Sequence, residues 1–162
     1  MLVVLHYLHV LFAFVWFAAA FSAHWNMRQA RRAQEWSVRE TLFAVNRGLS
    51  ALVGLPALVG VGLVGNWFAV QIGYRMKDTP LMVVANSLWL ALVVVTLAWE
   101  MPVTGALGAL AHASADAAAR GGRGEPAGWS RELSRWRMAN TVQLMLFGVL
   151  LAIMIAPWGV VK

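Results

Sequence analysis

Apolar residues gather into four long runs, separated by segments rich in charged or small residues. The runs cover residues 2–23, 49–70, 80–99 and 140–157, and each is close to the ~20 residues that a helix needs to cross a bilayer core. Within a run the apolar character is nearly continuous, whereas barrel strands show ~10-residue segments of alternating character. The pattern predicts an all-α integral membrane protein, an antiparallel bundle of four transmembrane helices in one domain, 1–162.

Composition agrees with a membrane protein. Hydrophobic residues make up 60% of the chain and charged residues 12%, whereas a soluble domain carries ~25% charged residues. The first run resembles the core of a secretory signal, but no Lys or Arg precedes it and it exceeds the usual ~7–15 residues, so we expect it to be helix one. The chain has no Cys, which excludes disulfides, thiolate metal sites and thiol catalysis.

Basic residues are concentrated in the two long segments between runs, 24–48 and 100–139. Ten of the thirteen lie there, five in each. They are Arg28, Arg31, Arg32, Arg39, Arg47, Arg120, Arg123, Arg131, Arg135 and Arg137. Under the positive-inside rule these two segments are cytoplasmic loops, and both termini lie on the outer, periplasmic side of a bacterial inner membrane. The net charge of +6 therefore indicates topology and affinity for anionic lipid head groups, and we expect no nucleic-acid partner.

Local signals refine the second helix and the loop before it. Residues 25–47 place aromatic residues among arginines, which predicts an interfacial helix that ends in a turn at Gly48. Small residues in the following run predict close packing, so helix two should be the centre of the bundle. Pro56 in its middle should kink it.

Two histidines, His6 and His9, lie inside the first apolar run, in the stretch LHYLHVLFAFVWFAA. At ~1.5 Å per residue, His9 lies roughly 10 Å below the outer end of helix one, a depth at which Asn86 of helix three is a plausible hydrogen-bond partner. One reading is a polar pair that fixes helix register. The other is a metal site, because intramembrane ionisable groups are functional by default and neutral imidazole is a common ligand.

Geometry limits which metal these histidines can hold. His6 and His9 share one helix face, so both can contact one small ion such as copper, but they cannot clamp opposite faces of a haem. A haem here would be held by one histidine per chain, with an open or non-histidine second position or a partner subunit. At the inner end of helix three, Glu100 and Pro102 with His24, Asn140 and Gln143 predict either a cytoplasmic polar pocket or simple satisfaction of helix ends.

Several spaced motifs carry a family resemblance. His9 and Trp16 form Leu-His-x6-Trp, helix two reads Pro56-x3-Gly60-x4-Gly65-x-Trp67, and helix four is entered through Arg137-x2-Asn140. The chain resembles a four-helix membrane superfamily that contains haem-binding bacterial protoporphyrinogen IX oxidases, copper-resistance D proteins and uncharacterised predicted integral membrane proteins.

The resemblance implies that His9 is the ligand of a b-type haem. We expect Trp16 and Asn86 beside it, and Gly62 and Gly65 to leave room for a flat ring. The oxidases need a helix-three lysine, which this chain lacks, with Asn86 near its place. The resemblance therefore favours a haem protein without oxidase activity.

Three functions follow as hypotheses. The first is a small redox protein that holds b-type haem through His9, alone or as a subunit of a respiratory or photosynthetic complex. The second is a non-catalytic accessory subunit that packs against other membrane subunits or its own copies. The third is a copper-handling protein that uses His6 and His9.

Overall fold

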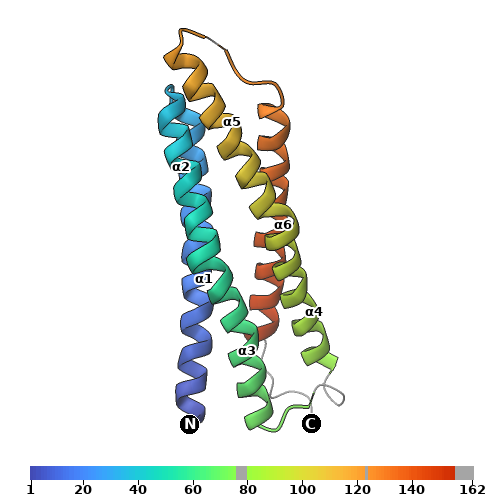
Figure 1. Ribbon diagram of the computed structural model, residues 1–162. Coiled ribbons are helices and arrows are strands. Elements are labelled where there is room, and N and C mark those ends of the chain that lie inside the picture. The colour runs from blue at the N-terminus through green and yellow to red at the C-terminus, as the bar shows by residue number, and fades with distance from the viewer. Residues whose placement is uncertain (76–79, 123, 156–162) are drawn as a thin grey trace.

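The computed structural model describes residues 1–75, 80–122 and 124–155, with side chains through Ile153, and this part of the chain is helical without strands (Figure 1). Its elements are α1 (Leu2–Arg32), α2 (Trp36–Leu49), η1 (Ser50–Gly54), α3 (Leu55–Gln71), α4 (Pro80–Val95), η3 (Thr96–Glu100), α5 (Met101–Ala119) and α6 (Trp129–Ile155). The π-helical turns η1 and η3 join their neighbours into two continuous helices. Among the described residues, four helices are thus long and apolar enough to cross a membrane.

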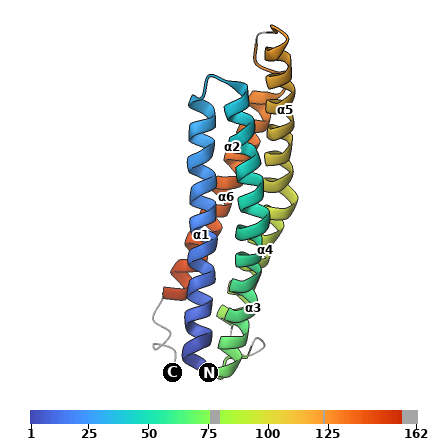
Figure 2. The same ribbon diagram turned by 60° about the vertical axis from the view of Figure 1, so that its left-hand side comes forward.

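These helices continue well beyond the predicted membrane spans, and α2 lies largely within the helix predicted over residues 25–47. The expected loops 24–48 and 100–139 are mostly helix, because α1 runs to Arg32, α2 begins at Trp36, and α5 occupies 101–119. The predicted turn at Gly48 does not exist, since α2 passes through that residue and the chain instead reverses between Arg32 and Trp36. Figures 1 and 2 show α2 and α5 together at the end of the molecule away from the N-terminus.

The extended part has an apolar core of its own, which explains why it folds as helix. Its buried members are Met27, Ala30, Phe43, Val103, Leu107, Ala111, Trp129 and Trp136. The sequence predicts that the aromatic residues of 25–47 lie at the bilayer interface, yet Phe43 is only 1% exposed. A buried amide pair adds polar contacts between α1 and α2: Asn26 Nδ2 donates to Asn46 Oδ1 at 3.0 Å, and Asn46 Nδ2 donates to the Ala23 carbonyl at 3.2 Å.

A second core lies in the part of the bundle that contains the predicted spans. Its buried members are Trp16, Ala57, Leu58, Leu92 and Leu150, contributed by α1, α3, α4 and α6. The indole of Trp16 packs against Phe147 with ring centroids 4.7 Å apart. Small residues of α3 permit close contacts between helices there, as the sequence predicts.

Each internal proline follows a π-helical turn. Pro56 comes two residues after η1, and Pro102 comes two residues after η3. Proline has no N–H to donate and its ring clashes with the carbonyl four residues earlier. A wider π turn is one way in which a helix accommodates such an interruption and continues. The two prolines therefore mark irregular turns within continuous helices.

Candidate functional site

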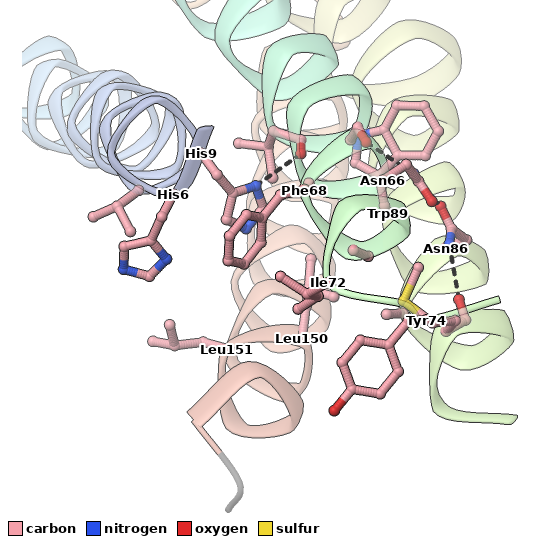
Figure 3. Close-up of a pocket in the computed structure, with 17 residues that line it drawn as sticks. His6, His9, Asn66, Phe68, Ile72, Tyr74, Asn86, Trp89, Leu150 and Leu151 are labelled. Atoms are coloured by element: carbon pink, nitrogen blue, oxygen red, sulfur yellow. Dashed lines mark hydrogen bonds between the residues drawn. The ribbon is translucent and has the colours of Figure 1, made fainter. Parts of the chain in front are cut away.

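A large cavity lies beside His9, between α1, α3, α4 and α6 (Figure 3). Its volume is about 540 Å³, within the ~300–1,000 Å³ that small-molecule pockets span. Most lining side chains are apolar, and the few polar groups include His6, His9, Asn66 and Asn86. This combination of an apolar wall with a few polar groups is typical of a cofactor or small-ligand site.

Helix α3 fixes the imidazole of His9 through one backbone bond. His9 Nδ1 lies 3.0 Å from the Val61 carbonyl oxygen. Because a carbonyl oxygen only accepts, Nδ1 carries the ring hydrogen and Nε2 retains its lone pair. Within the described residues Nε2 has no hydrogen-bond partner, so His9 presents an oriented, neutral nitrogen ligand at the cavity.

Two glycines of α3, Gly62 and Gly65, allow side chains of neighbouring helices to approach closely. A Cβ at Gly65 would meet the His9 ring at 2.6 Å, and a Cβ at Gly62 would overlap the indole of Trp89. That indole is held in place, because Trp89 Nε1 donates to the Leu58 carbonyl at 2.8 Å. Both glycines also line the cavity beside these rings, so the expectation that they leave room for a ligand ring stays a prediction.

Asn86 lines the cavity but does not bond to a histidine. Its Oδ1 accepts from Asn66 Nδ2 at 2.6 Å, and its Nδ2 donates to the Met82 carbonyl at 2.8 Å. Asn66 also donates to the Gly62 carbonyl at 2.8 Å. The predicted Asn86–His9 pair is therefore replaced by an Asn66–Asn86 pair between α3 and α4. Asn66 was not predicted as part of the site, although it is one of two polar residues in the apolar run 49–70.

The other two predicted site residues, His6 and Trp16, do not lie together with His9 in one cluster. His6 lines the cavity, but its ring packs against Phe68 with centroids 5.4 Å apart, and Figure 3 shows its ring pointing away from that of His9. Trp16 is not a lining residue of this cavity and instead borders a smaller one nearer η1 and η3. No cluster of three or more His, Asp or Glu side chains suited to a metal occurs among the described residues.

The predicted polar pocket is present as a second, smaller cavity. Glu100, Asn140 and Gln143 line it, and His24 Nδ1 lies 3.0 Å from Asn140 Oδ1. Ser50 and Thr96, which sequence reading did not assign to it, complete its polar lining. Each of these two is the first residue of a π-helical turn.

The fold and these sites define a class, a four-helix protein of the membrane type with a histidine beside an apolar cavity. Searches against protein-family models, curated proteins and solved structures gave no match to this chain.

Proposed function

We propose that this protein is a small membrane redox protein that binds one b-type haem through Nε2 of His9. The observation that carries the proposal is the His9–Val61 bond, which orients the ring and leaves Nε2 as the ligand nitrogen beside a large apolar cavity. A histidine that binds a metal through one ring nitrogen usually donates a hydrogen bond from the other to a carboxylate, a backbone carbonyl or water. Bound b-type haem would supply reversible one-electron transfer.

The residues around the cavity suit a porphyrin in chemistry as well as size. The walls contributed by Phe68, Ile72, Leu150 and Leu151 are apolar, as the faces of the macrocycle require. Met82 brings a thioether to the same lining, and thioether is one of the known second axial ligands of haem iron. Because no other histidine of the described chain lines the cavity besides His6, the proposal is one haem per chain with His9 as the essential protein ligand.

The proposal includes a topology. We infer an antiparallel bundle in a bacterial inner membrane, with both termini in the periplasm and the α2–α5 end in the cytoplasm, because the arginine-rich segments belong to that end. The haem would then lie toward the periplasmic side. Fusions of a reporter that is active only in the cytoplasm test this orientation: activity is expected at residue 34 and not after Lys162, and the opposite result would reverse it.

Haem content of purified variants tests the function. The protein is isolated from haem-replete cells, and haem per chain is measured by the pyridine haemochrome method for the parent, His9→Ala and His6→Ala. We expect loss of haem in His9→Ala and retention of most of it in His6→Ala, because only His9 has its ring fixed by a backbone bond. Added imidazole should restore haem binding to His9→Ala by supplying the missing ligand.

Two outcomes would contradict the proposal. A parent protein without haem would return His9 to the role of a buried polar group that fixes helix packing. Equal haem retention in both variants would assign the ligand elsewhere. Circular dichroism and gel filtration of each variant separate ligand loss from misfolding.

A further inference from the structure

Between the two π-helical turns lies a small cavity with several polar lining residues that the haem proposal does not use. Its volume is about 20 Å³, which is enough for one water molecule or one small ion, since ~10–15 Å³ suffices for a water. The wall facing it from α1 is apolar and includes Trp16 and alanines. Its polar side chains come from the other three long helices. They are Ser50, Thr96, Glu100, Asn140 and Gln143.

Glu100 is the unusual member of this group, because it is a buried carboxylate without a cation beside it. Its residue is 4% exposed, and no Lys, Arg or His forms an ion pair with it among the described residues. The other buried glutamate, Glu132, is 5% exposed but pairs with Arg135 at 2.9 Å and Arg131 at 3.2 Å. An isolated buried charge costs several kcal/mol, so Glu100 needs either a proton or a positive partner that the described chain does not provide.

Hydrogen bonds leave one carboxylate oxygen of Glu100 available. Oε1 accepts from Ser50 Oγ at 3.2 Å, and it lies 3.3 Å from Thr104 Oγ1, whose one hydrogen is shared with the Glu100 carbonyl at 2.9 Å. Oε2 has no hydrogen-bond partner among the described residues, although Glu100 lines the cavity. Hydroxyl donors on Oε1 stabilise the ionised carboxylate. Oε2 is therefore the oxygen of Glu100 that is available to bind a cation.

The amide of Gln143 offers a second oxygen. Thr96 Oγ1 donates its hydrogen to the Leu92 carbonyl at 2.8 Å, so this oxygen accepts from Gln143 Nε2 at 2.9 Å. That bond fixes the orientation of the amide and leaves Gln143 Oε1 without a partner in the described chain. Both Gln143 and Thr96 line the cavity. All the acceptors that this arrangement leaves available at Glu100, Gln143, Ser50 and Thr96 are oxygens.

We propose that this cavity binds a single sodium ion, with Glu100 and Gln143 as principal ligands and the hydroxyl oxygens of Ser50 and Thr96 completing its shell. An all-oxygen site suits a hard cation. One carboxylate balances one positive charge, whereas Ca²⁺ takes ~6–8 oxygens and would leave a buried net charge. A proton on Oε2 would neutralise Glu100 but would leave both the cavity and the Gln143 oxygen unused.

The surrounding backbone favours an ion site as well. η1 contributes Ser50, and η3 contributes Thr96 and Glu100, so three of the four ligands lie on π-helical turns, whereas Gln143 lies on the regular helix α6. π-helical turns occur frequently at functional sites, and interrupted transmembrane helices hold Na⁺ in several transporter folds. Glu100 is the only carboxylate that lines the cavity, and His24 is linked to the lining only through Asn140.

Thermal unfolding of the purified full chain in nanodiscs tests the proposal. Tm is measured in sodium, potassium and choline chloride at equal ionic strength. A ligand that binds only the folded state raises stability with the logarithm of its concentration above Kd. We expect Tm to rise with sodium concentration, to rise less in potassium and to stay constant in choline. Glu100→Gln, an isosteric neutral variant, should lose this response.

Glu132→Gln is the matched control, because it neutralises the buried glutamate that already has arginine partners. It should lower Tm in all three salts and keep the sodium response. Gln143→Leu retains the charge of Glu100 and should shift the response to higher sodium concentration, which gives a second readout should Glu100→Gln fail to fold. Equal Tm in sodium and choline across pH, or a sodium response that survives in Glu100→Gln, would overturn the proposal. A pH dependence of Tm that Glu100→Gln removes, without any sodium response in the parent, would identify the ligand as a proton.

Discussion

Ser50 Oγ donates a hydrogen bond to Glu100 Oε1 at 3.2 Å, which joins the first residue of one π-helical turn to the last residue of the other. The two residues lie fifty positions apart, and each turn is followed two residues later by a proline. The irregular parts of two long helices therefore meet at one level of the bundle. This contact places a buried carboxylate where the helices are least regular.

Removal of the Ser50 hydroxyl should destabilise the protein. Hydrogen bonds to charged groups contribute about 1.5–3 kcal/mol, and Thr104 Oγ1 shares its hydrogen between the same oxygen at 3.3 Å and the Glu100 carbonyl at 2.9 Å. We expect Ser50→Ala to lower the free energy of unfolding by about 1.5 kcal/mol, at the low end of that range. Equilibrium unfolding in denaturing detergent measures the change. Ser22→Ala, at an exposed position of α1, is the control, and an equal effect of both substitutions would contradict the assigned bond.

The Asn66–Asn86 pair should show measurable coupling between α3 and α4. Interhelical hydrogen bonds in membrane proteins average about 0.6 kcal/mol and reach about 1.7 kcal/mol. The short Asn66–Asn86 bond of 2.6 Å places this pair toward the upper value, so Asn86→Leu should cost roughly 1 kcal/mol. A double-mutant cycle with Asn66→Leu isolates the coupling. Zero coupling would mean that the two amides do not interact in the bilayer.

Sequence reading predicted the membrane spans and the histidine beside a cavity because both depend on local pattern. Four apolar runs of this length are stable as helices in lipid. A polar histidine within one of them is expected to face the neighbouring helices rather than the lipid. A helix within 25–47 was also predictable, but its packing into a core was not, because Phe43 and Trp136 carry the same composition signal whether they face lipid head groups or each other. Their burial is decided by the packing of α2, α5 and α6, which no single segment reveals.

Partners across helices were the least predictable feature. Depth along the membrane correctly placed Asn86 near the level of His9, since both line one cavity. Depth does not determine how a helix is rotated about its axis, however. The observed rotations make the Val61 carbonyl the hydrogen-bond partner of His9, and Asn66 that of Asn86. Trp16 was placed with His9 by motif spacing, yet seven residues along a helix separate them by about 10 Å, and Trp16 borders the other cavity.

Addition of one methyl group at Gly65 should disturb the histidine site. A Cβ there would lie 2.6 Å from the His9 ring, which its bond to Val61 holds in place. Overpacking of this kind costs about 1–3 kcal/mol, so Gly65→Ala should lower Tm and reduce haem per chain. Gly148→Ala is the matched control, since nothing lies within 4 Å of its Cβ position. Retention of haem and Tm in Gly65→Ala would show that His9 is free to move.

His112 should titrate above the ordinary range of a histidine. It lies on α5 beyond the predicted span 80–99, and its Nδ1 is 2.7 Å from Glu40 Oε1 of α2. The Glu40 carboxylate, through this hydrogen bond and its charge, raises the pKa of His112 from the ordinary 6.5, and Asp116 adds a smaller effect in the same direction.

Because the folded pKa of His112 is raised, the pair stabilises the folded state fully below pH 6.5, and this contribution is lost as pH rises through the folded pKa. NMR titration of the His112 ring in the intact protein measures that pKa. Glu40→Gln should lower it toward 6.5, and Asp116→Asn should lower it less. Since the side chain of His112 is 63% exposed, salt should weaken the effect by screening. An unchanged pKa in Glu40→Gln would show that α2 and α5 do not hold these two groups together in solution.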